Sequence, residues 1–379
     1  MEIRQVQMGA PADAVDLAPL ARIAPQLVFV FGSAHRLTDP RLGSQLRAAL
    51  GETAHLVGCS TSGEITDQGV VDDGLVVTAM RFAEPAFRVV SIAYDGMADS
   101  DGAGRRLAQQ LAGEGLRSIL VLGQGVNING SALVAGIGQV AGDGVAVSGG
   151  LAGDGGLFKH TWTLCDGVVS DRQVVGIGFY GDAIRLTFGS YGGWQPFGAT
   201  RLVTRAQANI LYELDGEPAL EIYRRYLGDY ASDLPGSALL FPFAMIGPDH
   251  SETGLIRTIL GIDETAGSLT LAGDIVEGGY LRLMTASTDA LVDGAEAAAG
   301  AARPATHADE ACLALLVSCV GRKLVMGGRV EEEVEAVKAV LGGNTVITGF
   351  YSNGEISPYA GVTPCQLHNQ TMAITCIRD

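Results

Sequence analysis

Two glutamates end the same kind of glycine-rich segment at distant points of the chain. Residues 58–65 read GCSTSGEI and residues 349–356 read GFYSNGEI, so Glu64 and Glu355 each follow a glycine in matching positions. Two carboxylates held close together could serve as a general acid and a general base. Carboxylates in such turns also act as caps or as ion-pair partners, and both interpretations stay open.

A third glycine-rich segment, residues 149–154 (GGLAGD), lies between these two in the sequence. Each segment follows an apolar run, and open α/β sheets bind ligands at the ends of buried strands. Small residues there would let a ligand approach the backbone, although glycine also serves turns that need a positive φ. The candidate ligand-binding residues of the three segments are Cys59, Ser60, Thr61, Ser62, Gly63, Glu64, Gly149, Gly150, Asp154, Tyr351, Asn353 and Glu355.

Arg322 follows another strongly apolar run and is a further candidate ligand-binding residue. A guanidinium in such a place needs an acceptor, which would be Glu64, Glu355 or the carboxylate of a ligand. A salt bridge and a ligand clamp are equally compatible with this position. Cys59 and Cys319 also lie at strand ends, but a nucleophilic thiol requires an adjacent base, and we expect both to pack in the core.

His368 and His160 are candidate axial ligands of a haem iron, although a hydrogen-bonded histidine is the commoner alternative for each. The sequence contains no GxxxxGK[ST], HExxH, GxSxG or CxxC motif, so we expect neither a metal site nor a catalytic residue. A GxGxxG pattern at residues 176–181 precedes an extended run instead of a helix, which favours strand glycines over a nucleotide site.

Each glycine-rich segment ends one copy of a repeated strand–helix–strand plan. Apolar runs form the strands, an apolar stripe marks one face of each helix, and acidic residues in the first turn of the third helix favour its N-terminus. The elements are expected at residues 27–31, 40–50 and 55–57 in the first copy, at 119–122, 131–141 and 145–147 in the second, and at 313–317, 331–341 and 345–347 in the third.

The sequence between the second and third copies indicates a mixed sheet. Residues 161–188 alternate with period two and are broken by turn residues at 166–167 and 181–182, which is typical of β-hairpins. Helices are expected at 207–214 and 217–227. We therefore predict an α/β protein with mixed sheets, repeated strand–helix–strand units and a hairpin-rich middle section, divided near residue 200 into modules of residues 1–200 and 201–379.

Composition and charge exclude several classes of protein. With 379 residues, 47% hydrophobic and 18% charged, the chain can bury a substantial core and is neither disordered nor fibrous. Its net charge of −17 would repel nucleic acids and anionic membranes. No apolar run or leader suggests a membrane span or a signal peptide. We expect a cytoplasmic protein whose six cysteines are reduced.

Long ordered motifs across nearly the whole chain resemble the FIST family of sensory proteins. The N-terminal module is similar at residues 58–65, at 127–130 (NING) and at 149–154. The C-terminal module is similar at 318–322 (SCVGR), at 349–356 and at 367–372 (LHNQTM). One departure is Gln124, where an acidic residue is expected, so an acid role at this position is in doubt.

The resemblance implies an input module of bacterial signal transduction that binds a small molecule such as an amino acid. We expect the protein to be non-catalytic and its ligand to be an amino acid or another carboxylate. Some members of the family resemble haem-binding sensors of nitric oxide that act on histidine kinases or cyclic-di-GMP enzymes, which is the alternative function. We expect no kinase or diguanylate cyclase domain on this chain, so a signal would pass to a separate partner protein.

Overall fold

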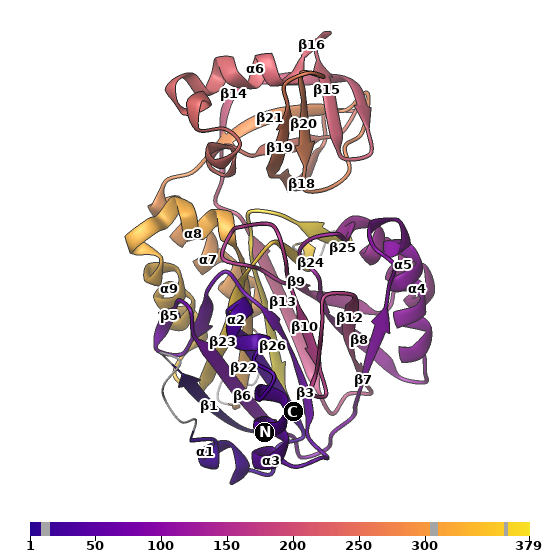
Figure 1. Cartoon of the computed structure of the whole chain (residues 1–379), viewed down its shortest axis with the longest axis vertical. Helices are drawn as coiled ribbons and strands as arrows, with labels where there is room; N and C mark the ends of the chain where they lie inside the picture. The colour runs from indigo at the N-terminus through magenta and orange to yellow at the C-terminus, as the bar shows by residue number, and fades with distance from the viewer. Residues whose placement is uncertain (9–15, 304–309, 360–362) are drawn as a thin grey trace.

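The computed structural model describes residues 1–8, 16–303, 310–359 and 363–379. They form a body of three six-stranded sheets and, at one end of it, a smaller β-rich insert (Figure 1). The fold class predicted from the sequence, a mixed α/β protein with repeated strand–helix–strand units, is confirmed. No helix in these ranges is long and apolar enough to cross a bilayer.

The three sheets of the body have the same strand plan. Sheet 1 has the order β1 (Glu2–Met8), β6 (Leu75–Arg81), β2 (Leu27–Gly32), β3 (His55–Ser60), β10 (Thr163–Cys165), β11 (Val168–Ser170). Sheet 2 has the order β7 (Phe87–Ala93), β12 (Gln173–Tyr180), β8 (Leu116–Gly123), β9 (Ala146–Leu151), β24 (Gly354–Tyr359), β25 (Thr363–His368). Sheet 3 has the order β13 (Arg185–Tyr191), β26 (Met372–Arg378), β22 (Cys312–Cys319), β23 (Thr345–Ser352), β4 (Glu64–Thr66), β5 (Gly69–Val71).

A parallel pair lies at the centre of each sheet, and all other pairings are antiparallel. These pairs are β2–β3, β8–β9 and β22–β23, which are the three strand–helix–strand copies expected from the sequence. The outer hairpin of each sheet comes from another copy: β4–β5 follows β3 but pairs with β23, β10–β11 follows β9 but pairs with β3, and β24–β25 follows β23 but pairs with β9. The three copies therefore exchange hairpins in a closed cycle.

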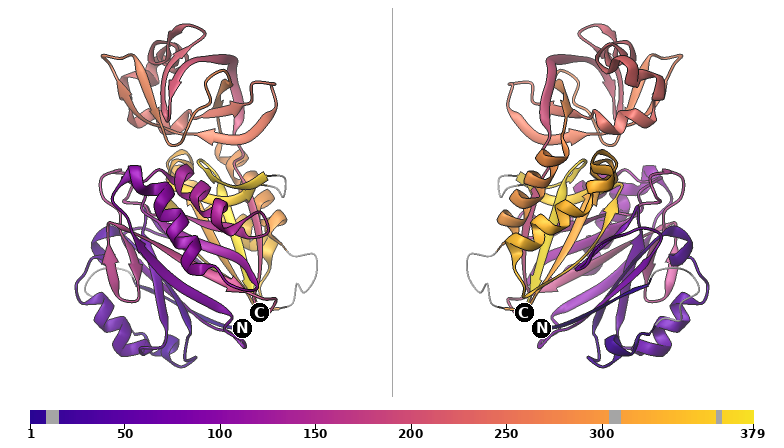
Figure 2. Two further views of the ribbon diagram at one scale, coloured as in Figure 1. Left: turned by 90° about the vertical axis from the view of Figure 1, so that its right-hand side faces the viewer. Right: turned by 90° about the vertical axis from the view of Figure 1, so that its left-hand side faces the viewer.

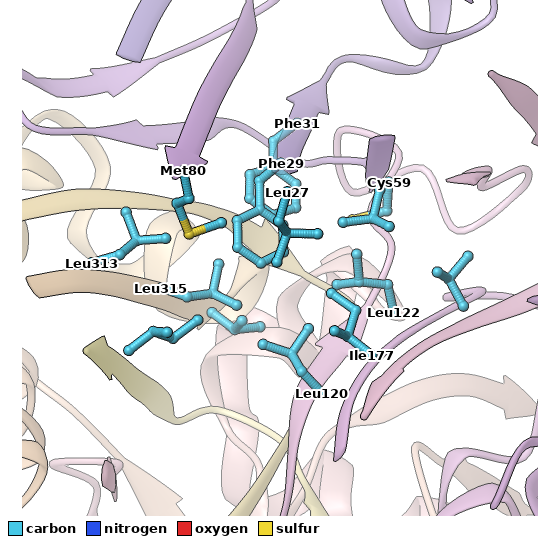
Figure 3. Packing of buried hydrophobic residues seen from close by; sticks show 14 of the residues in the cluster. Leu27, Phe29, Phe31, Cys59, Met80, Leu120, Leu122, Ile177, Leu313 and Leu315 are labelled. Atoms are coloured by element: carbon cyan, nitrogen blue, oxygen red, sulfur yellow. The ribbon is translucent and has the colours of Figure 1, made fainter. Parts of the chain in front are cut away.

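Helices cover the outer face of each sheet, and the inner faces pack on one another. The helices of the body are α1 (Ala18–Ala21), α2 (Ala34–Leu37), α3 (Leu42–Leu50), α4 (Ser100–Leu111), α5 (Gly130–Ala141), α7 (Thr288–Ala302), α8 (Val320–Met326) and α9 (Glu331–Leu341), with short 3₁₀ turns at Met97–Asp99 and Gly327–Arg329. Figure 3 shows side chains from all three sheets meeting in a central apolar core that includes Phe31, Leu122 and Leu315. Its burial provides the main stabilisation of the body.

The insert runs from β14 to β21 and has its own core. It contains β14 (Gln195–Gln207), β15 (Ile210–Leu214), β16 (Glu217–Pro218), α6 (Ala219–Leu227), β17 (Phe243–Ile246), β18 (Glu252–Arg257), β19 (Ile259–Asp263), β20 (Ser268–Leu271), β21 (Tyr280–Thr285) and 3₁₀ turns at Gly228–Asp233 and Gly236–Leu240. Figures 1 and 2 show it at the end of the molecule opposite the two chain termini. The boundary predicted near residue 200 falls within β14 and stays a prediction.

One predicted helix is wrong, and its neighbour is confirmed. Residues 207–214, expected to be helical, contain β15, which pairs with β14 and β20. Ala208 and Asp215, at the two ends of this strand, have positive φ, and a right-handed helix cannot continue through residues with positive φ. Sheet pairing here overrides a local apolar pattern that fits either structure. The second expected helix is α6.

Candidate functional site

The three glycine-rich turns meet at the ends of the central parallel strands. The backbone N–H of Ser62 donates to Tyr351 O at 2.8 Å, and that of Gly153 donates to Ser60 O at 2.8 Å. A third bond runs from Asn353 N–H to Leu151 O at 3.2 Å. In these three bonds each turn donates once and accepts once, and Tyr351 N–H also donates to Gly63 O at 2.8 Å. The first three bonds between the turns, which we call the turn ring, join residues as far apart in the chain as Ser62 and Tyr351.

Glycine is required where the return strands approach their parallel partners. A Cβ atom on Gly149 would lie 1.9 Å from the carbonyl oxygen of Val121, and the equivalent Gly58 and Gly349 have the same relation to Val30 and Leu316. No side chain fits in that space. Gly149 and its neighbour Gly150 lie within β9 and allow the close approach of backbone that the turn ring needs. They do not line the cleft described below.

A cleft of about 500 Å³ opens on the outer side of the turn ring, between α2, the first turn and α8. This volume is typical of small-molecule sites. Of the residues predicted from the sequence, it is lined by Thr61, Ser62, Gly63, Glu64 and Asp154. The sequence reasoning missed five other polar residues that line it, which are Ser33, His35, Asp72, Asp73 and Lys323.

Glu64 lies at the floor of this cleft. The Thr61 hydroxyl donates to its Oε1 at 2.5 Å, and the Gly74 N–H donates to its Oε2 at 3.0 Å. Burial raises the pKa of Glu64 to about 7, against the lowering effect of these two bonds. The Glu64 carboxyl therefore titrates near neutral pH.

Glu355 makes the same contacts in the third turn. The Ser352 hydroxyl donates to its Oε1 at 2.5 Å, and the N–H and hydroxyl of Thr371 donate to its Oε2 at 3.1 and 3.0 Å. Burial raises its pKa to about 8. Each glutamate thus closes its own turn, and no hydrogen bond joins Glu64 to Glu355 among the residues described. The geometry favours two separate caps over a general acid and base acting together.

Arg322 is not directed at a carboxylate of the turns. Its Nε and Nη2 donate to Glu333 Oε2 at 3.2 and 2.8 Å, Nη2 also donates to Leu291 O at 2.8 Å, and Nη1 donates to Gly192 O. The expectation that its acceptor is Glu64, Glu355 or a ligand is corrected, because Glu333 holds it in a pair with both side chains 0% exposed. Arg322 thereby fixes α8 against α7 and α9.

Lys323, the next residue, points the other way, into the cleft. Its ammonium donates to Ser62 O at 2.8 Å, contacts Asp72, and lies 5.2 Å from the centre of the Tyr351 ring. The side chain of Lys323 is 17% exposed, whereas that of Asp72 is 74% exposed. The sequence offered one signal for this residue, since Lys323 is one of only three lysines in the chain.

Asp154 holds the loop that forms one wall of the cleft. Its carboxylate accepts backbone N–H groups from Phe158, Lys159 and His160 at 2.9, 2.6 and 3.1 Å. These bonds engage both oxygens, so Asp154 shapes the wall. Gln124, where an acidic residue was expected, is buried and bonds to Thr161, Ser170 and Gln173, so an amide that both donates and accepts serves here.

The remaining candidates lie below or beside the cleft. Cys59 and Cys319 are buried, and burial raises the pKa of both thiols well above the ordinary value, so neither is a thiolate at neutral pH. Tyr351 is buried and its hydroxyl donates to Glu333 at 2.7 Å. Asn353 lines a separate hollow of about 80 Å³ between the body and the insert.

Neither candidate histidine fits a haem. His368 is buried, its Nε2 donates to Ser357 O at 3.0 Å, and burial lowers its pKa to about 4. The hollow lined by the adjacent Leu367 measures about 80 Å³, well below the volume of pockets that hold cofactors. His160 packs beside Trp162, with 6.1 Å between ring centres, and lines neither this hollow nor the cleft beside the turn ring.

Replacing Gly153 by alanine should destabilise the protein by about 1–3 kcal/mol, because the new methyl group overpacks the turn ring. An added Cβ would lie 2.5 Å from Ser62 Oγ and 2.8 Å from Tyr351 O. The matched control is Gly138→Ala within α5, where nothing lies within 4 Å and alanine should be neutral or stabilising. Urea unfolding of both variants measures the difference; equal stability would show that the ring is not tightly packed.

Comparisons with known proteins cover most of the chain. The sequence model of the FIST N domain matches residues 26–217, and that of the FIST C domain matches residues 219–358. An uncharacterized protein of Mycobacterium tuberculosis is 30% identical over 196 residues, which are 48% of this chain and 49% of that protein. An uncharacterized protein of Mycobacterium bovis is 27% identical over 194 residues, 48% of each chain. The chain spans about half the length of these curated relatives.

Proposed function

This chain belongs to the FIST family, and from that premise we propose that it is a sensory module of bacterial signal transduction that binds a small molecule in the cleft beside the turn ring. The observation that carries the proposal is the convergence of separate chain segments on one hollow of about 500 Å³. A ligand there would touch the first turn, the loop held by Asp154 and the start of α8 together. A ligand could therefore shift the relative positions of these three segments, and a sensor needs such a ligand-dependent change of conformation.

We propose a ligand with a carboxylate, such as an amino acid, and Lys323 as its anchor. The ammonium of Lys323 is already held by Ser62 O and the Tyr351 ring, so little order is lost when a ligand binds. Asp72 is the exposed member of the pair and can give way to a ligand carboxylate. Asp72 and Asp73 would then face an amino group of the ligand.

We further propose that the cleft is non-catalytic and that the protein works in the cytoplasm. Polar side chains of the floor and of one wall of the cleft already have hydrogen-bond partners within the protein. Thr61 donates to Glu64, and Asp154 accepts backbone N–H groups of its own loop. The signal would pass to a separate protein, such as a histidine kinase or a cyclic-di-GMP enzyme. The net charge of −17 favours a partner with a basic docking surface.

A thermal-shift screen of amino acids and small carboxylates tests the proposal. A ligand at about 100 times its Kd should stabilise the protein by about 2.7 kcal/mol. Lys323→Met should weaken binding by about tenfold or more, because a charge-assisted hydrogen bond is lost. Lys338→Met is the matched control, since Lys338 pairs with Asp67 at the surface. Equal responses of the wild type and Lys323→Met to every hit would refute the anchor, and a screen without hits would count against the cleft.

A further inference from the structure

Another hollow, of about 180 Å³, lies at the joint between the body and the insert, apart from the smaller one lined by Asn353, and we call it the joint hollow. Trp194, just before β14, Met245 of β17 and Met284 of β21 contribute its apolar wall, and Thr371 contributes from the body. The three apolar side chains are buried. The joint hollow shares no lining residue with the cleft of about 500 Å³ beside the turn ring, which we call the turn cleft. It is therefore a separate site.

Arg282 brings a positive charge to this hollow. It lies on β21, between β14 and β17, and its side chain is half-buried. Its Nε donates to Thr200 Oγ1 at 2.9 Å. Within the described ranges, Arg282 has no ion pair with a carboxylate, and Nη1 and Nη2 have no hydrogen-bond partner. A guanidinium presents these two groups as a fork that matches a carboxylate.

The same arginine also lines an adjoining hollow of about 190 Å³, where the rings of His250 and Tyr280 stack with centroids 4.3 Å apart. Arg282 thus stands between two recesses on the outer face of the insert sheet. The alternation of β21 explains this, since Tyr280, Arg282 and Met284 point to one face while Leu281 and Leu283 enter the core of the insert.

We propose that the joint hollow binds a monocyclic aromatic carboxylate, with its ring against Trp194 and the two methionines and its carboxylate on Arg282. A dry apolar cavity of about 150 Å³ accepts a benzene ring, so the volume of the joint hollow suits a single ring. Methionine sulfur and an indole ring both make favourable contacts with aromatic rings. The unpaired guanidinium supplies the charge that selects the acid over its neutral analogue.

Such a ligand would touch the body and the insert at once. Gly192, which lines the hollow, accepts a hydrogen bond from Arg322, and Thr371 holds the Glu355 carboxyl. Binding would therefore tie the orientation of the insert to groups that anchor the turns of the body. This site does not depend on whether the turn cleft binds its own ligand.

Tryptophan fluorescence gives a direct test, because the chain has two tryptophans and only Trp194 lines the joint hollow. In a Trp162→Phe background, titration with benzoate should change the emission of Trp194 and reach saturation. Benzamide, which has the same ring without the charge, should bind at least tenfold more weakly, and acetate should leave the emission unchanged. Absence of a saturable response to benzoate, or equal affinity for benzamide, would overturn the proposal.

Substitutions of Arg282 test whether this residue binds the carboxylate of the ligand. Arg282→Gln should weaken benzoate binding by about tenfold or more, and Arg282→Lys should restore part of the affinity because it keeps the charge but not the fork. Lys323→Met, in the turn cleft, should leave benzoate affinity unchanged. Circular dichroism of each variant verifies folding, and a folded Arg282→Gln that binds benzoate like the wild type would refute the role of Arg282. A loss of benzoate binding in Lys323→Met would place the ligand in the turn cleft and overturn the proposal.

Discussion

Replacing Arg322 by alanine should destabilise the folded protein by about 3–5 kcal/mol, because it leaves the Glu333 carboxylate buried without its positive partner. Both side chains are 0% exposed. The Ser318 and Tyr351 hydroxyls still donate to Glu333 Oε1, at 3.0 and 2.7 Å, but neither supplies a compensating charge. The carbonyls of Gly192 and Leu291 would lose their donor as well. Urea unfolding followed by circular dichroism measures the loss.

Arg329→Ala is the matched control for this prediction. Arg329 also pairs with carboxylates, Glu332 and Asp289, but its side chain is 51% exposed. Solvent screens such pairs, so the change should stay below about 1 kcal/mol. An unfolding midpoint of Arg322→Ala close to that of Arg329→Ala would contradict the role of Arg322 as a buried structural group.

The free energy of unfolding should fall as the pH rises from about 6.5 to 9, because Glu64 and Glu355 must lose their protons inside the fold. Their pKa values, about 7 and about 8, lie above the ordinary value of 4.5, so the folded state binds more protons than the unfolded state in this range. Stability from these groups is complete below pH 4.5 and is lost through pH 7–8. One pKa unit corresponds to about 1.4 kcal/mol, so the combined loss should reach several kcal/mol.

Glu355→Gln should remove the larger share of this pH dependence. A neutral glutamine amide can keep its carbonyl oxygen on the Thr371 donors and place its NH₂ against the Ser352 hydroxyl oxygen, so the variant should stay stable at pH 9. Glu335→Gln, on the exposed side of α9, should keep the dependence of the wild type. The measurement stops at pH 6.5 because His368, with a pKa lowered to about 4, acts in the opposite direction below that value. Unfolding curves for Glu355→Gln that fall with pH as steeply as those of the wild type would contradict the prediction.

Local sequence patterns predicted much of the body. Of the apolar stripe expected at Val330, Val334, Val337 and Leu341, the last three are buried in α9, whereas Val330 precedes the helix and is half-buried. The glycines expected to end the first two helices, Gly51 and Gly142, have the positive φ that suits a helix end. Helix periodicity and capping depend on residues a few positions apart, so a single sequence displays them.

The candidate site was predicted in part. The three turns were identified because their motifs repeat, and the structure brings them together through the turn ring. Which of their residues reach the cleft could not be inferred, since Gly149 and Gly150 lie in a strand while Ser62 and Glu64 line the hollow. Arg322 and Lys323 are adjacent in sequence, yet consecutive residues on a helix point about 100° apart. One therefore enters the core of the body and the other the cleft.

The sequence alone determined the three strand–helix–strand copies, their glycine turns and the mixed character of the sheets, because each depends on short-range periodicity. Only the tertiary structure decided that the copies exchange hairpins, that Arg322 pairs with Glu333, and that residues 210–214 form a strand of the insert. These outcomes arise from contacts between distant segments, where burial and the pairing of backbone groups outweigh local preference.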